Sequence, residues 1–299
     1  MIYCYKDRWN WGSDLYDAVT KRGLKAKMFS SSVEVAGESY AFMHMAHCPL
    51  NRRDTDKRVA RAISEKPGVI LIPTPTECWL YDDKYLFHEK CGAWEPTTYY
   101  STSKEEAKKA LAKLNYPFVS KSKIGAGSSN VRLIKNEAQA HREIDIAFGD
   151  IGLPQFAGGG QKGYVLWQEF CDGNPNDWRV IIIAKKYGFV LKRFNRPNIP
   201  FASGSGRLKA ISTLDDEIDA LLNFTRNFAI ENEFSFLGVD IVYGRNHKPV
   251  VLEITTGWSR EGYVGCRVFE YSNGFKPTAM DGARNLFDIV VMGMEKGEF

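Results

Sequence analysis

The sequence predicts a mixed α/β protein built from more than one sheet. Strand and helix patterns alternate over residues 2–72, which is typical of a parallel α/β layer. Apolar runs of strand length follow one another over residues 164–193 and indicate an antiparallel sheet. Two more strand patterns, residues 236–243 and 248–255, are separated by a short turn and predict a hairpin.

The composition is that of an ordinary globular protein. The 299 residues are 44% hydrophobic and 25% charged, and this length suits one large or two to three small subdomains. The net charge of +4 is too small to indicate binding to nucleic acid or to a membrane. No apolar run approaches membrane-spanning length and no signal-peptide pattern is present, so we expect a cytoplasmic protein. The six scattered cysteines include no Cys-x-x-Cys pair, which argues against a zinc site or disulfide framework.

Residues 1–95 are predicted to form an N-terminal α/β domain. We expect strands at residues 2–5, 24–29, 40–45 and 68–72, and helices at 13–22 and 54–65. The layer is too short for a full dinucleotide-binding fold, and no Gly-x-Gly-x-x-Gly follows its first strand. Trp9 and Trp11 follow that strand and either line a pocket or pack in the core.

Residues 96–164 are predicted to form a small lid subdomain and residues 165–299 a large one. The expected lid elements are a helix over 103–114 capped by Ser103, strands at 116–121 and 131–134, and a helix over 137–148. In the large subdomain we expect strands 164–170, 178–184 and 187–193 in one antiparallel sheet, a helix over 215–232 capped by Thr213, the hairpin, and a terminal helix from Met280 to about Met294.

Each strand of the predicted hairpin carries one acidic residue among apolar neighbours. Asp240 and Glu253 have no local partner, and carboxylates are seldom buried without one. In an antiparallel register they stand side by side on one face, where a divalent cation would satisfy both. The alternative is a hairpin whose acidic side chains face water.

A small-residue loop follows the strand that ends at Lys121. Its glycines would let backbone N–H groups approach anionic oxygens, its serines add donors, and the lysine adds a positive charge. The segment therefore has the ingredients of a polyphosphate site, although it is not a Walker A loop, because the lysine precedes the glycines. An ordinary hairpin turn with an exposed lysine is the alternative.

A predicted strand leaves its sheet at residues 168–172, which exposes backbone N–H and C=O groups that can form hydrogen bonds with the edge of an adenine. Glu169 or Asp172 could accept from ribose hydroxyls, unless the segment is only a loop rich in turn formers. Asp177 and Arg179 share one face of the following strand, as a salt bridge or as part of a site.

In this order, the segments resemble the ATP-grasp superfamily. The resemblance covers about residues 70–260 and rests on Asp83-Lys84, residues 116–121, the loop 125–129, Gln168-Glu-Phe170 with Asp177 and Arg179, Arg193 with residues 198–206, and Gly238-Val-Asp240 with Leu252-Glu253. It implies a short Rossmann-like N-terminal layer and two sheets that clamp a nucleotide. It also implies an activity in which ATP phosphorylates a substrate carboxylate and an amine displaces the phosphate.

The resemblance further implies a role for each matching residue. Arg193 or Arg179 would stabilise the oxyanion of the second step. Asp240, Glu253 and Thr255 would hold Mg²⁺, or Mn²⁺ in its place. ATP would be bound by Lys84, Lys121, Gly125, Gly127, Ser128, Ser129, Gln168, Glu169, Phe170, Cys171 and Asp177.

Two departures and several alternatives accompany the resemblance. Thr255 stands where many relatives have asparagine, and the asparagine of the middle motif is Asn195 or Asn198. Trp258 and Tyr263 either line the substrate pocket or pack in the core. We expect a carboxylate–amine ligase acting on small-molecule or peptide substrates, without nucleic acid or membrane partners, and a homodimer is left open. The alternatives are a nucleotide-binding regulatory or scaffold protein and a phosphotransferase on the same fold.

Overall fold

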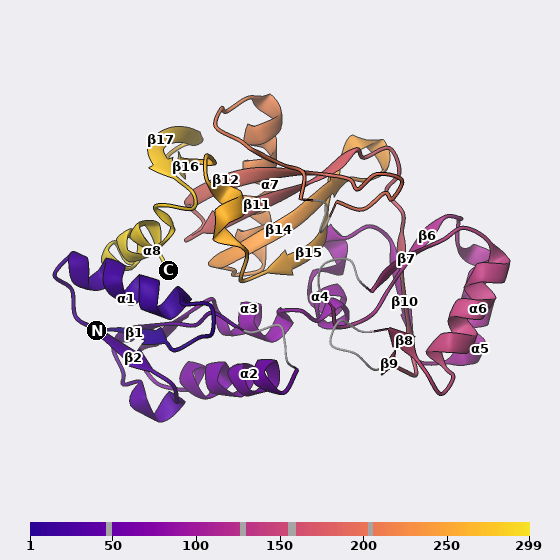
Figure 1. Cartoon of the computed structure of the whole chain (residues 1–299), viewed down its shortest axis with the longest axis horizontal. Coiled ribbons are helices and arrows are strands. Elements are labelled where there is room, and N and C mark those ends of the chain that lie inside the picture. The colour runs from indigo at the N-terminus through magenta and orange to yellow at the C-terminus, as the bar shows by residue number, and fades with distance from the viewer. Residues whose placement is uncertain (46–49, 126–129, 155–159, 203–205) are drawn as a thin grey trace.

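The computed structural model describes residues 1–45, 50–125, 130–154, 160–202 and 206–299, and its strands in these ranges form three main sheets. Figure 1 shows a parallel sheet near the N-terminus, a small antiparallel sheet at the far end, and a larger sheet between and above them. The structure is therefore a mixed α/β fold, as the sequence predicts. The division into residues 1–95, 96–164 and 165–299 remains a prediction. In the described ranges, no helix combines the length and apolar character that crossing a membrane requires.

The N-terminal layer is a four-stranded parallel sheet. Its strands β1 (Ile2–Tyr5), β2 (Ala26–Phe29), β3 (Ser39–Phe42) and β4 (Val69–Ile72) lie in the order β2-β1-β3-β4. Helices α1 (Trp11–Lys21) and α2 (Leu50–Ser64) confirm the predicted alternation, and the short helix α3 (Pro75–Leu80) follows. Trp11 is buried and Trp9 is exposed, so packing is the correct alternative for Trp11.

The small antiparallel sheet has the order β5-β10-β6-β7. Its strands are β5 (Thr98–Ser101), β6 (Phe118–Lys121), β7 (Val131–Ile134) and β10 (Val165–Glu169). The helices beside it are α4 (Lys84–Cys91), α5 (Lys104–Ala110) and α6 (Glu137–Ala147), and β8 (Leu153–Pro154) pairs with β9 (Gly160–Gln161). Ser103 caps α5 as predicted, because its hydroxyl accepts from the Glu106 N–H at 3.3 Å.

One expectation about this sheet is wrong. The strand over residues 164–170 does not join the two strands that follow it, because β10 pairs with β5 and β6 instead. The intervening loop contains Gly173, which has a φ of 79°, and Pro175. These residues end the strand and lead the chain into a different sheet.

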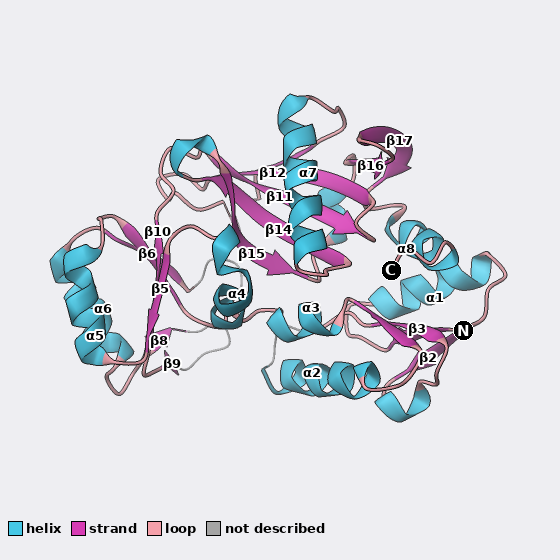
Figure 2. Ribbon diagram, turned by 180° about the vertical axis from the view of Figure 1, so that it is seen from behind, coloured by secondary structure: helices cyan, strands magenta, loops and turns pink. Residues whose placement is uncertain are grey.

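The large sheet has seven strands in the order β15-β14-β11-β12-β16-β17, with β13 paired to β12. The strands are β11 (Asn176–Ile183), β12 (Tyr187–Phe194), β13 (Leu208–Ala210), β14 (Phe236–Tyr243), β15 (Pro249–Thr255), β16 (Arg267–Tyr271) and β17 (Phe275–Asp281). Helix α7 (Asp216–Glu231) crosses one face, as Figure 2 shows, and α8 (Leu286–Glu295) packs against α1.

Two helix boundaries in this region differ from prediction. Asp215 rather than Thr213 caps α7, because its carboxylate accepts from the Ile218 N–H at 2.9 Å. The terminal helix begins at Leu286, since Met280 is part of β17.

The N-terminal layer and the large sheet share one hydrophobic core. Trp11 meets Phe236 of β14 edge to face at 6.2 Å between ring centroids, and it meets Trp258 at 5.2 Å. Trp258 and Tyr263 are buried in this core, so packing is the correct alternative for them. The shared core fixes the large sheet against the first 72 residues.

Candidate nucleotide-binding and active site

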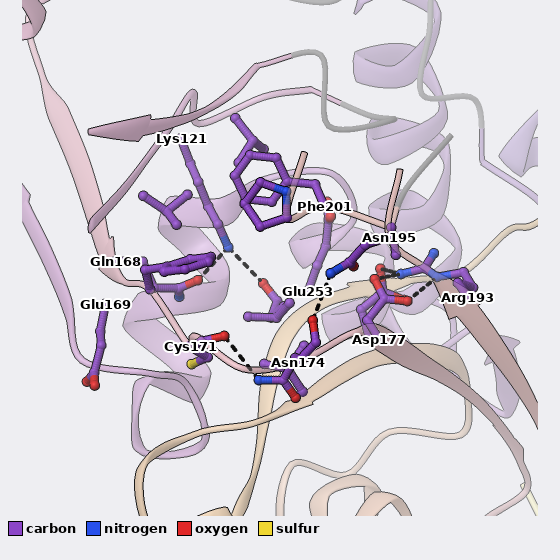
Figure 3. A pocket seen from close by; sticks show the side chains of 18 of the residues that line it. Lys121, Gln168, Glu169, Cys171, Asn174, Asp177, Arg193, Asn195, Phe201 and Glu253 are labelled. Carbon is purple, nitrogen blue, oxygen red and sulfur yellow. Dashed lines mark hydrogen bonds and ion pairs between the residues drawn. The ribbon is translucent and has the colours of Figure 1, made fainter. Parts of the chain in front are cut away.

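A pocket lies between the small and the large sheets, and its lining comes from both (Figure 3). The large sheet contributes β11, β12, β14 and β15, while β6, β10 and the start of α4 contribute from the other side. The predicted site residues that line it are Lys84, Lys121, Gly125, Gln168, Glu169, Phe170, Cys171, Asp177, Arg193, Asp240 and Glu253. Residues far apart in the sequence therefore converge on one cavity, as predicted.

Two lysines approach the pocket with different partners. The Lys84 ammonium donates to Glu253 Oε1 at 3.0 Å and to the Gly125 carbonyl at 2.8 Å. Lys121 donates to Gln168 Oε1 at 2.6 Å and to the Leu252 carbonyl at 3.3 Å. Burial is the largest effect on both and opposes the charge. At Lys84 the carboxylates of Glu253, Asp82 and Asp83 together outweigh burial and raise the pKa, whereas at Lys121 burial dominates and lowers the pKa.

A ladder of charged side chains crosses the large sheet on the pocket side. Asp240 of β14 stands opposite Arg179 on one neighbouring strand and opposite Glu253 on the other. Arg179 Nη2 donates to Asp240 Oδ2 at 2.7 Å, and Arg193 Nη2 pairs with the same oxygen at 2.7 Å. The predicted register of Asp240 beside Glu253 is confirmed. Neither acid has a partner close in the sequence, but both have distant ones, because arginines from β11 and β12 reach Asp240 and Lys84 reaches Glu253.

Arg193 is held more firmly than a solvent-exposed arginine. Asp177 stands opposite it in the register and accepts from its Nε and Nη2 at 2.6 and 2.7 Å. Burial raises the pKa of Asp177 despite this partner, whereas Arg179 and Arg193 overcome the burial of Asp240 and hold its pKa below the ordinary value. Arg193 lines the pocket, whereas Arg179 is not among its lining residues.

A β-bulge explains why Glu253 and its neighbour both face the pocket. Asp240 pairs with Glu253 and Ile241 pairs with Val251, which leaves Leu252 as an extra residue on β15. Bulges of this kind redirect side chains and often lie beside functional sites. The Leu252 side chain joins the pocket wall while its carbonyl accepts from Lys121. The sequence contains no local signal for this irregularity.

The connection between β10 and β11 forms the rear of the pocket. Asn174 fixes it, because its side chain donates to the Cys171 carbonyl at 3.0 Å and to the Tyr243 carbonyl at 2.8 Å. Glu169 forms an ion pair with Arg245, and Figure 3 shows its side chain turned away from the other labelled residues. The Glu169 carboxylate is therefore poorly placed for a ribose, although its backbone remains at the pocket.

Sequence reasoning missed much of the pocket lining. Val119 and Val131 face Val242 and Leu252 from the opposite sheets, and together they form apolar walls suited to a flat ring. The alternation of side chains along β6 and β14 could have revealed two of them, since Val119 and Val242 lie two positions from Lys121 and Asp240. Phe201 also lines the pocket.

The remaining predicted residues fall into three groups. Gly127, Ser128 and Ser129 lie outside the described residues. Asn195 lines the pocket and Asn198 is exposed, so Asn195 is the better placed of the two, and its assignment to the middle motif stays a prediction. Thr255 does not line the pocket, and its hydroxyl donates to the Gly257 carbonyl at 2.6 Å.

The carboxylates offer oxygen donors of the type that Mg²⁺ prefers. In the described ranges, no three His, Cys, Asp or Glu side chains gather as a metal cage. Mg²⁺ is commonly held by one or two carboxylates together with substrate phosphates, so a complete cage is not required. Glu253 Oε2 makes no hydrogen bond to any described residue, whereas both oxygens of Asp240 accept from arginines. The donor set therefore fits one magnesium ion held mainly by Glu253 and by phosphate oxygens.

Comparisons with known proteins identify the fold. No protein-family model and no curated protein matches the chain. The ATP-grasp ligase PsnB, in complex with a minimal precursor, Mg and ADP, has a TM-score of 0.61 and 13% identity over 98% of this chain and 97% of PsnB. The D-cycloserine synthetase DcsG has a TM-score of 0.58 and 13% identity over 85% of this chain and 91% of DcsG. A D-alanine–D-alanine ligase from Bacillus anthracis has a TM-score of 0.53 and 12% identity, with 85% of each chain covered.

Proposed function

We propose that this chain, which has the ATP-grasp fold, is an ATP- and magnesium-dependent ligase that joins a carboxylate to an amine. The observation that carries the proposal is the convergence of Lys84, Lys121, Glu253 and Arg193 on one pocket between two sheets. Phosphoryl transfer depends mainly on charge neutralisation and alignment, and these side chains supply both. Mn²⁺ could replace Mg²⁺ at an oxygen-rich site of this kind.

The proposed binding mode places the nucleotide base toward the rear of the pocket. The apolar walls formed by Val119, Val131, Val242 and Leu252 would enclose the base, and the backbone of residues 169–171 would meet its polar edge. The phosphates would lie toward Lys84 and Lys121, whose ammonium groups would exchange protein oxygens for phosphate oxygens. Glu253 would hold the metal, which neutralises phosphate charge when it is bound.

Two chemical steps would follow. A substrate carboxylate oxygen attacks the γ-phosphorus, the bond between this phosphorus and the ADP oxygen breaks, and an acyl phosphate forms. The amine nitrogen then attacks the acyl carbon, loses a proton, and inorganic phosphate leaves. Arg193 lies on the pocket wall, where it would stabilise the oxyanion of the second step, and Asp177 fixes its orientation.

A second candidate function is favoured by one observation. Asp240 is saturated by Arg179 and Arg193, and Thr255 is engaged with Gly257, so few oxygen donors remain for a second metal ion. A chain that binds nucleotide without turnover would show this arrangement.

The substrate class of a ligase can be proposed from a neighbour. PsnB binds a precursor peptide, and a peptide is likewise a suitable substrate for this chain if it is a ligase.

The decisive experiment uses mass spectrometry. The full chain is incubated with ATP, Mg²⁺ and an extract of metabolites and peptides, and condensation products are compared with those from Lys121→Ala and Glu253→Gln. We expect a product whose mass equals acid plus amine minus water, together with ADP, from the unmodified chain only. A phosphorylated product without condensation would indicate a phosphotransferase. ATP binding without any product would support the non-catalytic alternative.

A further inference from the structure

A chain of hydrogen-bonded polar side chains leads away from Lys121 through Gln168. The Gln168 amide oxygen accepts from Lys121, while its amide nitrogen donates to Thr98 Oγ1 at 2.9 Å and to Glu95 Oε1 at 3.4 Å. The other oxygen of Glu95 pairs with His88 Nδ1 at 2.9 Å. These residues come from α4, β5, β10 and the segment after Trp94, and Figure 3 shows Gln168 beside Lys121.

The donors and acceptors in this network fix the orientation of the Gln168 amide. Lys121 can only donate, and a charged Glu95 can only accept. Thr98 uses its own hydroxyl proton to donate to the Pro96 carbonyl at 2.8 Å, so its oxygen is left to accept from Gln168. The amide must therefore point its oxygen at Lys121, and Glu95 and Thr98 hold it there.

This arrangement separates the Lys121 charge from its nearest buried counter-charge. Lys84 forms a direct ion pair with Glu253, whereas no ion pair joins Lys121 to any described residue. Glu95 acts on Lys121 at one remove, through Gln168. When a phosphate approaches, an ammonium ion that is hydrogen-bonded to a neutral amide loses less interaction energy than one that is paired with a carboxylate.

The charges around Lys121 agree with this geometry. Burial lowers the pKa of Lys121, Lys84 on α4 lowers it further, and Glu95 and Glu253 raise it, with a smaller effect from Cys171. Glu95 is itself buried, which raises its pKa, and Lys121 and His88 oppose that shift. The His88 side chain is 24% exposed, and the Glu95 side chain is 4% exposed.

We propose that Glu95 is a positioning residue of the nucleotide site, which orients the Gln168 amide and thereby holds the Lys121 ammonium where a phosphate can reach it. The inference rests on the nucleotide-binding part of the proposed function. It assigns a role to an acid whose side chain is buried and which does not line the pocket.

The test is equilibrium ATP binding by Glu95→Gln in the presence of Mg²⁺, measured by calorimetry from about pH 6 to about pH 10. We expect binding about tenfold weaker than in the unmodified chain, the size of one lost interaction with a charged group. The decline of affinity at alkaline pH should also move to lower pH, because Lys121 loses its proton earlier without the Glu95 charge. The matched control is Glu89→Gln, which removes an exposed acid on α4, next to His88, and should change neither quantity.

A second variant protects the test against misfolding. Gln168→Glu places a carboxylate directly beside Lys121, so the alkaline decline should move to higher pH while ATP affinity falls. Unchanged affinity and pH profile in a folded Glu95→Gln would overturn the inference and leave the proposed function standing. If Glu95→Gln shows no cooperative thermal unfolding, an unshifted profile in Gln168→Glu would overturn it. An unmodified chain that binds no ATP would overturn both.

Discussion

We expect a substitution of Arg193 to slow the chemical step far more than it weakens ATP binding. It lies on the pocket wall, and Asp177 and Asp240 hold its guanidinium group. Removing one oxyanion donor lowers turnover by about 10²–10³-fold in enzymes, so Arg193→Met should reduce product formation by that order. ATP affinity should change much less, because the proposed binding mode places the phosphates at Lys84 and Lys121. Single-turnover product assays beside ATP binding would check this, with the exposed Arg267→Met as the control.

The acid stability of the protein depends on the arginines beside Asp240. Arg179 and Arg193 hold the pKa of Asp240 below its unfolded value despite its burial. Asp240 therefore stabilises the fold above about pH 4, its unfolded pKa, and this contribution is lost as the pH falls through the folded pKa. Arg179→Met raises the folded pKa, so acid unfolding should begin at higher pH. Far-UV circular dichroism during acid titration would measure the midpoint, and an unchanged midpoint would contradict the assignment.

At the scale of single elements, Glu77 joins α3 to the start of β14. Its carboxylate accepts from the backbone N–H groups of Ser235 and Phe236 at 2.9 and 2.8 Å and from Thr74 at 2.6 Å. Glutamine at this position would direct an amide N–H at one of these donors. Glu77→Gln should lower the free energy of unfolding by about 1–3 kcal/mol, the cost of an unsatisfied buried donor. Urea unfolding would show it, against Glu105→Gln on the exposed surface of α5.

The elements that the sequence predicts well are those with local signals. Ser103 and the alternation over residues 2–72 define helices and strands within a few residues, because caps and side-chain periodicity act locally. The partners of β10 could not be predicted, because strand pairing depends on where a loop directs the chain. The sequence suggested that Asp177 and Arg179 could pair with each other, because they lie on one face of the same strand. In the structure Asp177 pairs with Arg193 on β12, and Arg179 pairs with Asp240 on β14.

At the scale of the whole molecule, the pocket proposed to bind the nucleotide is lined by residues of two sheets that share no strand. The order of matching segments predicted this convergence, although the apolar walls and the polar side chains around Gln168 depend on distances that no sequence pattern contains. ATP with Mg²⁺ at 100 times its dissociation constant should stabilise the fold by about 2.7 kcal/mol. Thermal unfolding with and without ligand would check this. Lys121→Ala should remove most of the shift, and the exposed Lys113→Ala should retain it.

The extra residue on β15 has a consequence for comparing this chain with distant relatives. Since Leu252 adds one position before Glu253, an alignment that keeps this strand free of gaps would match Glu253 to the wrong side of a regular strand. Deletion of Leu252 would restore the pleat and leave Glu253 opposite Asp240, but it would remove the carbonyl that accepts from Lys121. Two chains of this fold can therefore carry the same carboxylates and differ in a backbone acceptor that only the length of the strand supplies.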